Sequence, residues 1–253
     1  MSNERGGEKA GERRAFMGKP LPYLDVEDLG GKLIVIEGTD GVGRSTQIAS
    51  LQKWLEVRGH GVVTTGWTRS PLMAKAINDA KAGHRLNVHT FSLFYAADFA
   101  DRLEHEILPA MRAGFVVLAD RYVYTVFARA AVRGADPAWV RKVFSFAPVP
   151  DAVFYMKIDV ENLIPRVIHP QQLRSRRLLE EGGSAAWGMD YWESGMDLRL
   201  GDDVYDSFVE YQRRLLAEFS GMSKEFGFLS VNAVRSFEDT NRRLKEGIAS
   251  VLS

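Results

Sequence analysis

The stretch Gly38 to Thr46, GTDGVGRST, constrains the fold of this chain more than any other. It follows the apolar run LIVI at residues 33–36 and opens a segment, residues 47–58, whose apolar residues recur at helical spacing. A buried strand, a glycine turn and a helix in this order are typical of a phosphate-binding loop, because backbone N–H groups of the turn and of the helix N-terminus converge on an anion. We therefore expect a nucleotide-phosphate site in an α/β protein.

The loop departs from the pattern G-x-x-x-x-G-K-[ST] at one position, where Arg44 replaces the lysine. Arginine keeps a permanent positive charge and can bind phosphate through two N–H groups, but its planar group is wider than an ammonium ion. The replacement can preserve binding with altered geometry, or it can indicate a weakened or lost phosphoryl transfer. A glycine turn that merely caps a helix, with Arg44 in solvent, is the alternative without a site.

Strand and helix patterns alternate along the chain, which favours a parallel sheet. We expect a three-layer α/β/α fold of the P-loop NTPase type with a five-stranded parallel sheet. The expected strands cover residues 33–36, 61–65, 115–119, 151–156 and 228–231. The expected helices cover residues 45–58, 72–82, 88–113, 123–132, 137–146, 160–168, 203–226 and 237–252.

The chain most simply forms one domain with a preceding extension, since 253 residues with 45% hydrophobic content can bury a sizeable core. Residues 1–29 are the extension, and residues 1 to about 20 mix charge and glycine as a loose tail does. Residues 30–253 are the domain. Within it, residues 169–202 break the pattern with scattered arginines and glycines, which indicates a lid.

Composition excludes several classes of protein. The 33 basic and 33 acidic residues balance, so net charge favours neither nucleic acid nor an anionic membrane as partner. The absence of cysteine excludes disulfides and thiolate metal sites, and fits a reducing compartment. No run of about 18 apolar residues occurs, and the N-terminus is too polar for a signal peptide. We expect a cytoplasmic protein.

A second chemical centre follows the apolar run at residues 115–119. A strand buried on both faces there delivers Asp120, Arg121 and Tyr122 to the carboxyl edge of the sheet, where open α/β folds bind ligands. Asp120 can also be a helix N-cap, although an acid at the exit of a buried strand and beside an arginine favours a site.

The chain resembles the thymidylate kinase family of nucleoside monophosphate kinases. The resemblance runs from about Lys32 to Leu252 and is strongest at IEGTDGVGRSTQ, FYAADFADRLEHEILPAMRAGFVVLADRY and PDAVFYMKIDV. It implies a P-loop kinase domain that transfers the γ-phosphoryl group of ATP, with Mg²⁺, to a deoxynucleoside monophosphate, by default dTMP. Such transfer depends on in-line positioning and on cations that neutralise the phosphate oxygens. The family also implies a homodimer that pairs through its long helices.

The resemblance also implies roles for particular residues. The residues that would hold the donor are Gly38, Gly41, Val42, Gly43, Arg44, Ser45, Thr46 and the lid arginines Arg174, Arg176 and Arg177. The residues that would take part in catalysis are Asp120, Arg44, Arg121 and Asp40, with Ser45 and Asp120 at the metal. The residues that would contact the acceptor are Asp40, Arg69, Tyr95, Phe99, Arg102, Arg121, Tyr122 and Arg129.

On the acceptor side, Asp40 matches a carboxylate near the sugar 3′-hydroxyl, and Asp120 matches an acid that organises magnesium and the acceptor. Arg69 and Arg121 match arginines that hold the acceptor phosphate from two sides, and Tyr95 matches an aromatic ring that stacks on the base. Each has an alternative: Tyr95 can be a core residue, Arg69 a surface residue, and the lid arginines a solvated cluster.

Three departures from the family lie on the acceptor side. The family's base-contacting arginine aligns with Phe99, and Arg102, three residues on, can replace it. The family's AYQ becomes Ala128-Arg129-Ala130, and its TREPG-like stretch becomes TRSPL at residues 68–72. Two alternatives therefore stay open: a kinase for another nucleotide or a small phosphorylated acceptor, and a nucleotide-binding regulatory protein with weakened catalysis.

Overall fold

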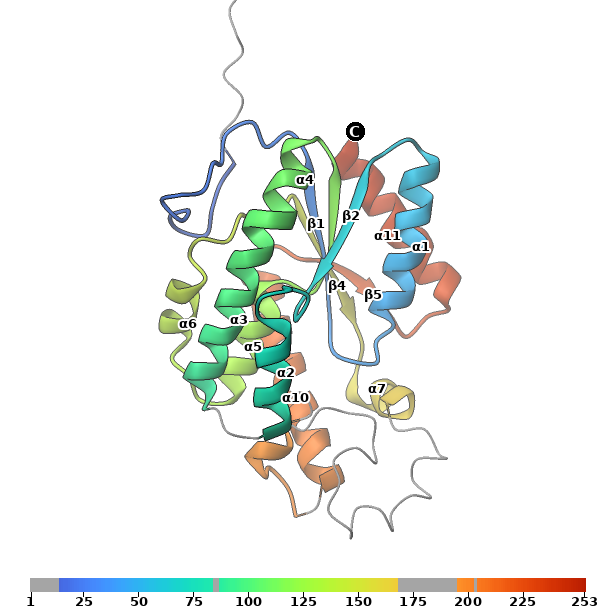
Figure 1. The fold of residues 1–253 in the computed structure, drawn as a ribbon. Coiled ribbons are helices and arrows are strands. Elements are labelled where there is room, and N and C mark those ends of the chain that lie inside the picture. Colours follow the sequence, from blue (N-terminus) through green and yellow to red (C-terminus); the bar gives the residue numbers. More distant parts are fainter. Residues whose placement is uncertain (1–13, 84–86, 168–194, 203) are drawn as a thin grey trace, which may run out of the picture.

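The structure is a computed structural model that describes residues 14–83, 87–167, 195–202 and 204–253. Its centre is a five-stranded sheet in the order β2-β3-β1-β4-β5, and every neighbouring pair of strands is parallel (Figure 1). The strands are β1 (Lys32–Glu37), β2 (Val62–Gly66), β3 (Val116–Asp120), β4 (Ala152–Lys157) and β5 (Leu229–Asn232). The expected five-stranded parallel sheet is confirmed.

The chain connects these strands through helices. Those before β4 are α1 (Arg44–Val57), α2 (Ala74–Gly83), α3 (Val88–Arg102), α4 (Leu108–Arg112), α5 (Val123–Val132) and α6 (Pro137–Val143). Those after β4 are α7 (Val160–Val167), α10 (Val204–Glu225) and α11 (Phe237–Leu252), and a 3₁₀ turn, η3 (Met196–Leu198), precedes α10. A π-helical segment, η1 (Leu103–Ile107), joins α3 to α4, so the long helix expected from residue 88 onward is continuous but locally wider.

The helices form a layer on each face of the sheet (Figure 1). Side chains alternate along β1, so Leu33 and Val35 belong to a core shared with α3, α5 and α10, while Ile34 and Ile36 belong to one shared with α1 and α11. All four are fully buried, as expected for a parallel strand covered on both faces. The three-layer α/β/α arrangement brings the ends of β1, β2 and β3 to one edge.

The N-terminal segment lies against the body at the other edge of the sheet. The backbone N–H of Met17 donates to the carbonyl of Ala147 at 2.9 Å, and that of Val149 donates to the carbonyl of Ala15 at 2.8 Å. Arg14 Nη1 lies 2.8 Å from Asp151 Oδ2. The expectation of a loose tail therefore does not hold for residues 14–17.

Two further expectations concern the described residues only in part. Most of the expected lid, including Arg174, Arg176 and Arg177, lies outside the described residues. Among the helices that are described, none has the length and apolar character needed to cross a membrane.

Candidate active site

The glycine loop between β1 and α1 leaves open space at the start of the helix. Gly43 is the N-cap of α1, with a φ of 97°, and no side chain caps the helix. A Cβ atom at Gly43 would meet no atom within 4 Å, whereas one at Gly41 would lie 2.4 Å from Val167 Cγ2. The glycine at position 43 thus permits the left-handed backbone conformation and keeps the N-terminus of α1 accessible to an anion.

The carboxylate of Asp120 is tied to the loop by two side chains. Arg44 Nε donates to Asp120 Oδ1 at 2.8 Å, and Ser45 Oγ donates to Asp120 Oδ2 at 3.1 Å. The pairing of β1 with β3 places Asp120 opposite Ile36, so the two strand ends bring the acid to the loop. The structure confirms that the two sequence motifs meet at one site.

Arg44 is buried and turned toward the loop itself. Its Nη1 donates to the carbonyl of Thr39 at 2.5 Å and to the carbonyl of Gly38. The side chain therefore joins the loop backbone to Asp120, and its planar group reaches both because its nitrogens point in different directions. The alternative of a solvated Arg44 does not hold, since the residue is only 7% exposed.

A cluster of arginines surrounds Asp40 in the same loop. Arg129 Nη2 donates to Asp40 Oδ2 at 2.9 Å, Arg121 Nη2 donates to Asp40 Oδ1, and Arg44 Nη2 lies 3.8 Å from Asp40 Oδ1. Three guanidinium groups against the two carboxylates of Asp40 and Asp120 leave one excess positive charge. Such an excess in a partly exposed site favours a phosphorylated ligand.

Glu37, at the end of β1, is a part of the site that the sequence analysis missed. Its carboxylate is fully buried and accepts hydrogen bonds from Tyr122 N at 2.7 Å and from Thr125 Oγ1 at 2.7 Å. Burial raises the pKa of the Glu37 carboxyl above its ordinary value. Glu37 holds the turn from β3 into α5, and the signal for it is an acid that closes an otherwise apolar strand.

Asp98 organises the loop that carries Arg69. Its carboxylate accepts hydrogen bonds from the backbone N–H groups of Thr68 at 3.3 Å and Ser70 at 3.1 Å. Arg69 is exposed and folds back over Gly66, the residue that pairs with Asp120 across β2 and β3. Arg69 therefore lies at the same sheet edge as the acid.

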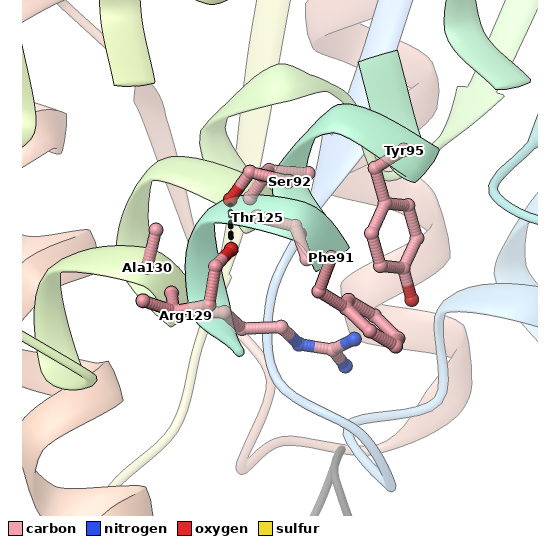
Figure 2. A pocket seen from close by; sticks show the side chains of 8 residues that line it. Phe91, Ser92, Tyr95, Thr125, Arg129 and Ala130 are labelled. Atoms are coloured by element: carbon pink, nitrogen blue, oxygen red, sulfur yellow. Dashed lines mark hydrogen bonds between the residues drawn. The ribbon is translucent and has the colours of Figure 1, made fainter. Parts of the chain in front are cut away.

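A small pocket opens between α3 and α5 (Figure 2). Phe91 and Tyr95 line it from α3, with ring centroids 5.0 Å apart, and Arg129 lines it from α5. Its lining residues are Val88, Phe91, Ser92, Tyr95, Thr125, Val126, Arg129 and Ala130. The structure thus brings Tyr95 and Arg129, both expected to contact the acceptor, to one pocket.

Three other expected acceptor residues lie elsewhere. Phe99 is 1% exposed within the aromatic core, and the hydroxyl of Tyr122 donates to the carbonyl of Pro148 at 2.8 Å. The guanidinium of Arg102 is buried, with Nε 3.0 Å from Asp98 Oδ2. None of the three lines the pocket, because Phe99 and Arg102 lie further along α3 than the pocket residues, where the helix packs on the core, and Tyr122 is buried at the start of α5.

The glycine loop, the acid that faces it from the next strand and the parallel sheet that holds both define a P-loop protein. The model of one family, "Thymidylate kinase", matches residues 36–181. The chain belongs to the thymidylate kinase family.

Individual relatives agree with this assignment. The "Probable thymidylate kinase 2" of Saccharolobus solfataricus is 35% identical over 210 residues, which are 83% of this chain and 91% of that protein. The "Probable thymidylate kinase" of Pyrococcus horikoshii is 30% identical over 216 residues, again 83% and 91% of the two chains. The "Thymidylate kinase" of Akkermansia muciniphila is 36% identical over 138 residues, which are 54% of this chain and 67% of that protein.

Proposed function

We propose that this protein is a dTMP kinase, which transfers the γ-phosphoryl group of ATP to dTMP and releases ADP and dTDP. One observation carries the proposal: Asp40, in the phosphate loop, receives a hydrogen bond from Arg129, which lines the pocket between α3 and α5. A donor site and an acceptor pocket that share a charged pair are placed for direct transfer between two bound nucleotides.

On the donor side, the loop backbone and Arg44 bind the phosphates of ATP. The open space at Gly43 and the uncapped start of α1 fit such an anion. Arg44 lies at the donor site with its position fixed by Asp120 and by the loop carbonyls. Because its charge is permanent, it stabilises negative charge on the transferred group without any change of protonation.

The oxygens of Ser45 and Asp120 fit a magnesium ion. They lie 3.1 Å apart at the entrance of the donor site, and hydroxyl and carboxylate oxygens are the hard ligands that Mg²⁺ prefers. Magnesium bound there supplies charge neutralisation to the phosphates of ATP. The role of this chain's residues is to hold those two oxygens beside the loop, which the hydrogen bonds of Asp120 do.

On the acceptor side, Asp40 binds the sugar hydroxyl, Arg69 and Arg121 bind the phosphate, and Tyr95 packs on the base. Arg121 and Asp40 are already paired, and Arg69 lies over the neighbouring strand end. These groups surround the space between the loop and the Phe91–Tyr95 pocket, so a monophosphate that spans it presents its phosphate to the donor.

We further propose a cytoplasmic homodimer, because the family resemblance implies a homodimer and the composition favours the cytoplasm. The cysteine-free composition supports a reducing compartment, and Leu93 on α3 is 51% exposed on the helix through which pairing is expected. Light scattering coupled to size-exclusion chromatography tests the dimer, which would have twice the chain mass of 28.4 kDa.

The assay that tests the kinase proposal is ADP release from ATP and Mg²⁺ in the presence of dTMP, dUMP, dGMP, dCMP or AMP at equal concentration. We expect release to be fastest with dTMP. Fast ADP release with another monophosphate and slow release with dTMP would identify a different acceptor. This outcome is worth testing because Phe99, which aligns with the family's base-contacting arginine, is buried. Binding of ATP without release for any acceptor would support a regulatory protein.

A further inference from the structure

Arg129 occupies a position between the pocket and the phosphate loop. It is buried on α5 and lines the pocket with Phe91 and Tyr95, while its Nη2 donates to Asp40 Oδ2 at 2.9 Å. In Figure 2 its guanidinium lies beside the ring of Phe91, and the hydroxyl of Tyr95 points to the same side. The charged group is therefore fixed at one end by the loop and presented next to two aromatic rings.

The two aliphatic hydroxyl groups of the pocket already use their hydrogens. The hydroxyl of Ser92 donates to the carbonyl of Val88 at 2.8 Å, the dashed line in Figure 2, and that of Thr125 donates to Glu37 at 2.7 Å. Among the residues that line the described pocket, Arg129 carries the only charge. The strongest donor that a ligand meets there is its guanidinium, which has five N–H groups and no acceptor.

No cation reaches this pocket from α3. The guanidinium of Arg102 is drawn into the core, where Nε donates to Asp98 at 3.0 Å and Nη1 donates to Thr65 Oγ1 at 2.8 Å. It also lies over the ring of Trp67, 5.1 Å from the ring centroid. Lys81 of α2 has its Nζ 6.0 Å from the centroid of the Tyr95 ring but does not line the pocket. Among the described residues that line the pocket, the charged donor is therefore Arg129 of α5.

We propose that Arg129 is the residue that sets base specificity, by donating a hydrogen bond to an oxo group of the acceptor's base. This inference rests on the proposed function. The pocket has a volume of about 20 Å³, so a base enters only when the side chains of Phe91, Tyr95 and Arg129 move apart. Once the base is inside, its oxo group accepts a hydrogen bond from Arg129. An amino group at the same place would instead direct its N–H donors toward the guanidinium, which has no acceptor.

The matched ligands for the test are dUMP and dCMP, which differ at one ring position by an oxo and an amino group. We expect kcat/KM of the native protein to favour dUMP over dCMP by about 100-fold, because a site built to hydrogen-bond one group rejects an analogue that leaves polar groups unpaired. Arg129→Ala should reduce this ratio to within about threefold, mainly through a higher KM for dUMP.

Two further variants separate specificity from structure. Arg129→Lys keeps the charge and loses the planar group, so its ratio should lie between the other two. Arg141→Ala removes an arginine of α6 that pairs with Glu225 at the surface, and it should leave the ratio unchanged. If Arg129→Ala fails to fold, Arg129→Gln and Arg129→Lys provide the same comparison.

An equal loss of kcat/KM for dUMP and dCMP in Arg129→Ala would overturn the proposal, since Arg129 would then contact a part that both ligands share. If no monophosphate, dTMP included, is phosphorylated, the proposed function fails but this inference stays testable. Calorimetric dissociation constants of dUMP and dCMP measure the same ratio without turnover, and an unchanged ratio in Arg129→Ala contradicts the role of Arg129.

Discussion

Arg44 Nε and Asp120 Oδ1 lie 2.8 Å apart, although 75 residues separate the two side chains in the sequence. The pair joins the loop that opens α1 to the end of β3, and Ser45 adds a second bond to the same carboxylate. These bonds fix the loop and the acid relative to each other, and such fixed groups lower the cost of ordering the site during phosphoryl transfer.

The charge of Asp120 can be removed with little change in shape. Asp120→Asn keeps one oxygen that accepts from Arg44 or Ser45, but it no longer provides a negative charge for magnesium. We expect kcat to fall by about 10²- to 10³-fold with the fold intact. Asp79→Asn, at an exposed pair with Lys75, is the control that should keep full activity. Native turnover in Asp120→Asn would remove this residue from the mechanism.

Arg44→Lys tests whether arginine is required in this loop. The arginine reaches Asp120 and two loop carbonyls at once, which one ammonium group at the end of a flexible chain does not do. We expect kcat/KM for ATP to fall about tenfold, because the loop and Asp120 lose the side chain that hydrogen-bonds to both. A rise in kcat/KM would show instead that the native loop is the impaired form.

Arg102 and Asp98 form a buried ion pair with a structural role. Arg102→Leu leaves the carboxylate of Asp98 fully buried without its cation, so urea unfolding should show a loss of about 3–5 kcal/mol. Arg242→Leu breaks an exposed pair with Asp239 on α11 and should cost less than about 1 kcal/mol. Equal losses in the two variants would show that the buried pair contributes no more than a surface pair.

Glu37 makes stability depend on pH. Because burial raises its folded pKa above the ordinary value of 4.5, the folded protein holds more protons than the unfolded chain above that pH. Its contribution to stability is present below pH 4.5 and is lost as pH rises through the folded pKa. Glu37→Gln has no carboxyl at this position that can titrate. Urea unfolding at several pH values should therefore show that the free energy of unfolding of the variant increases relative to that of the native protein as pH rises. Parallel curves would contradict this.

The fold was predictable because its main signals are local. The apolar run of β1 is continuous, since parallel strands are buried on both faces, and α5 and α11 begin and end at the expected residues. Ser236 caps α11 by accepting from Asp239 N at 3.2 Å. The π-helical segment at Leu103–Ile107 was not predicted, because one extra residue in a turn leaves the apolar spacing almost unchanged.

The site was predictable where short motifs carry it and not where distant helices meet. Asp120, Arg44 and Ser45 follow from strand ends and loop spacing, whereas the bond between Arg129 and Asp40 joins residues 89 positions apart. Arg102 shares a helix face with Phe99, Tyr95 and Phe91, but the pocket opens beside the first turns of α3 and Arg102 lies at its end, where it pairs with Asp98. Which stretch of that face borders a pocket depends on tertiary packing, which the spacing of residues does not show.

The central claim is that the donor loop and the acceptor pocket serve one phosphoryl transfer. The most direct measurement is chromatographic quantification of dTDP and ADP after incubation of the full-length protein with ATP, Mg²⁺ and dTMP. We predict that dTDP and ADP form in equal amounts and that Asp120→Asn slows the formation of both by about 10²- to 10³-fold. ATP binding without dTDP, or ADP formed at the same rate with and without dTMP, would contradict the account.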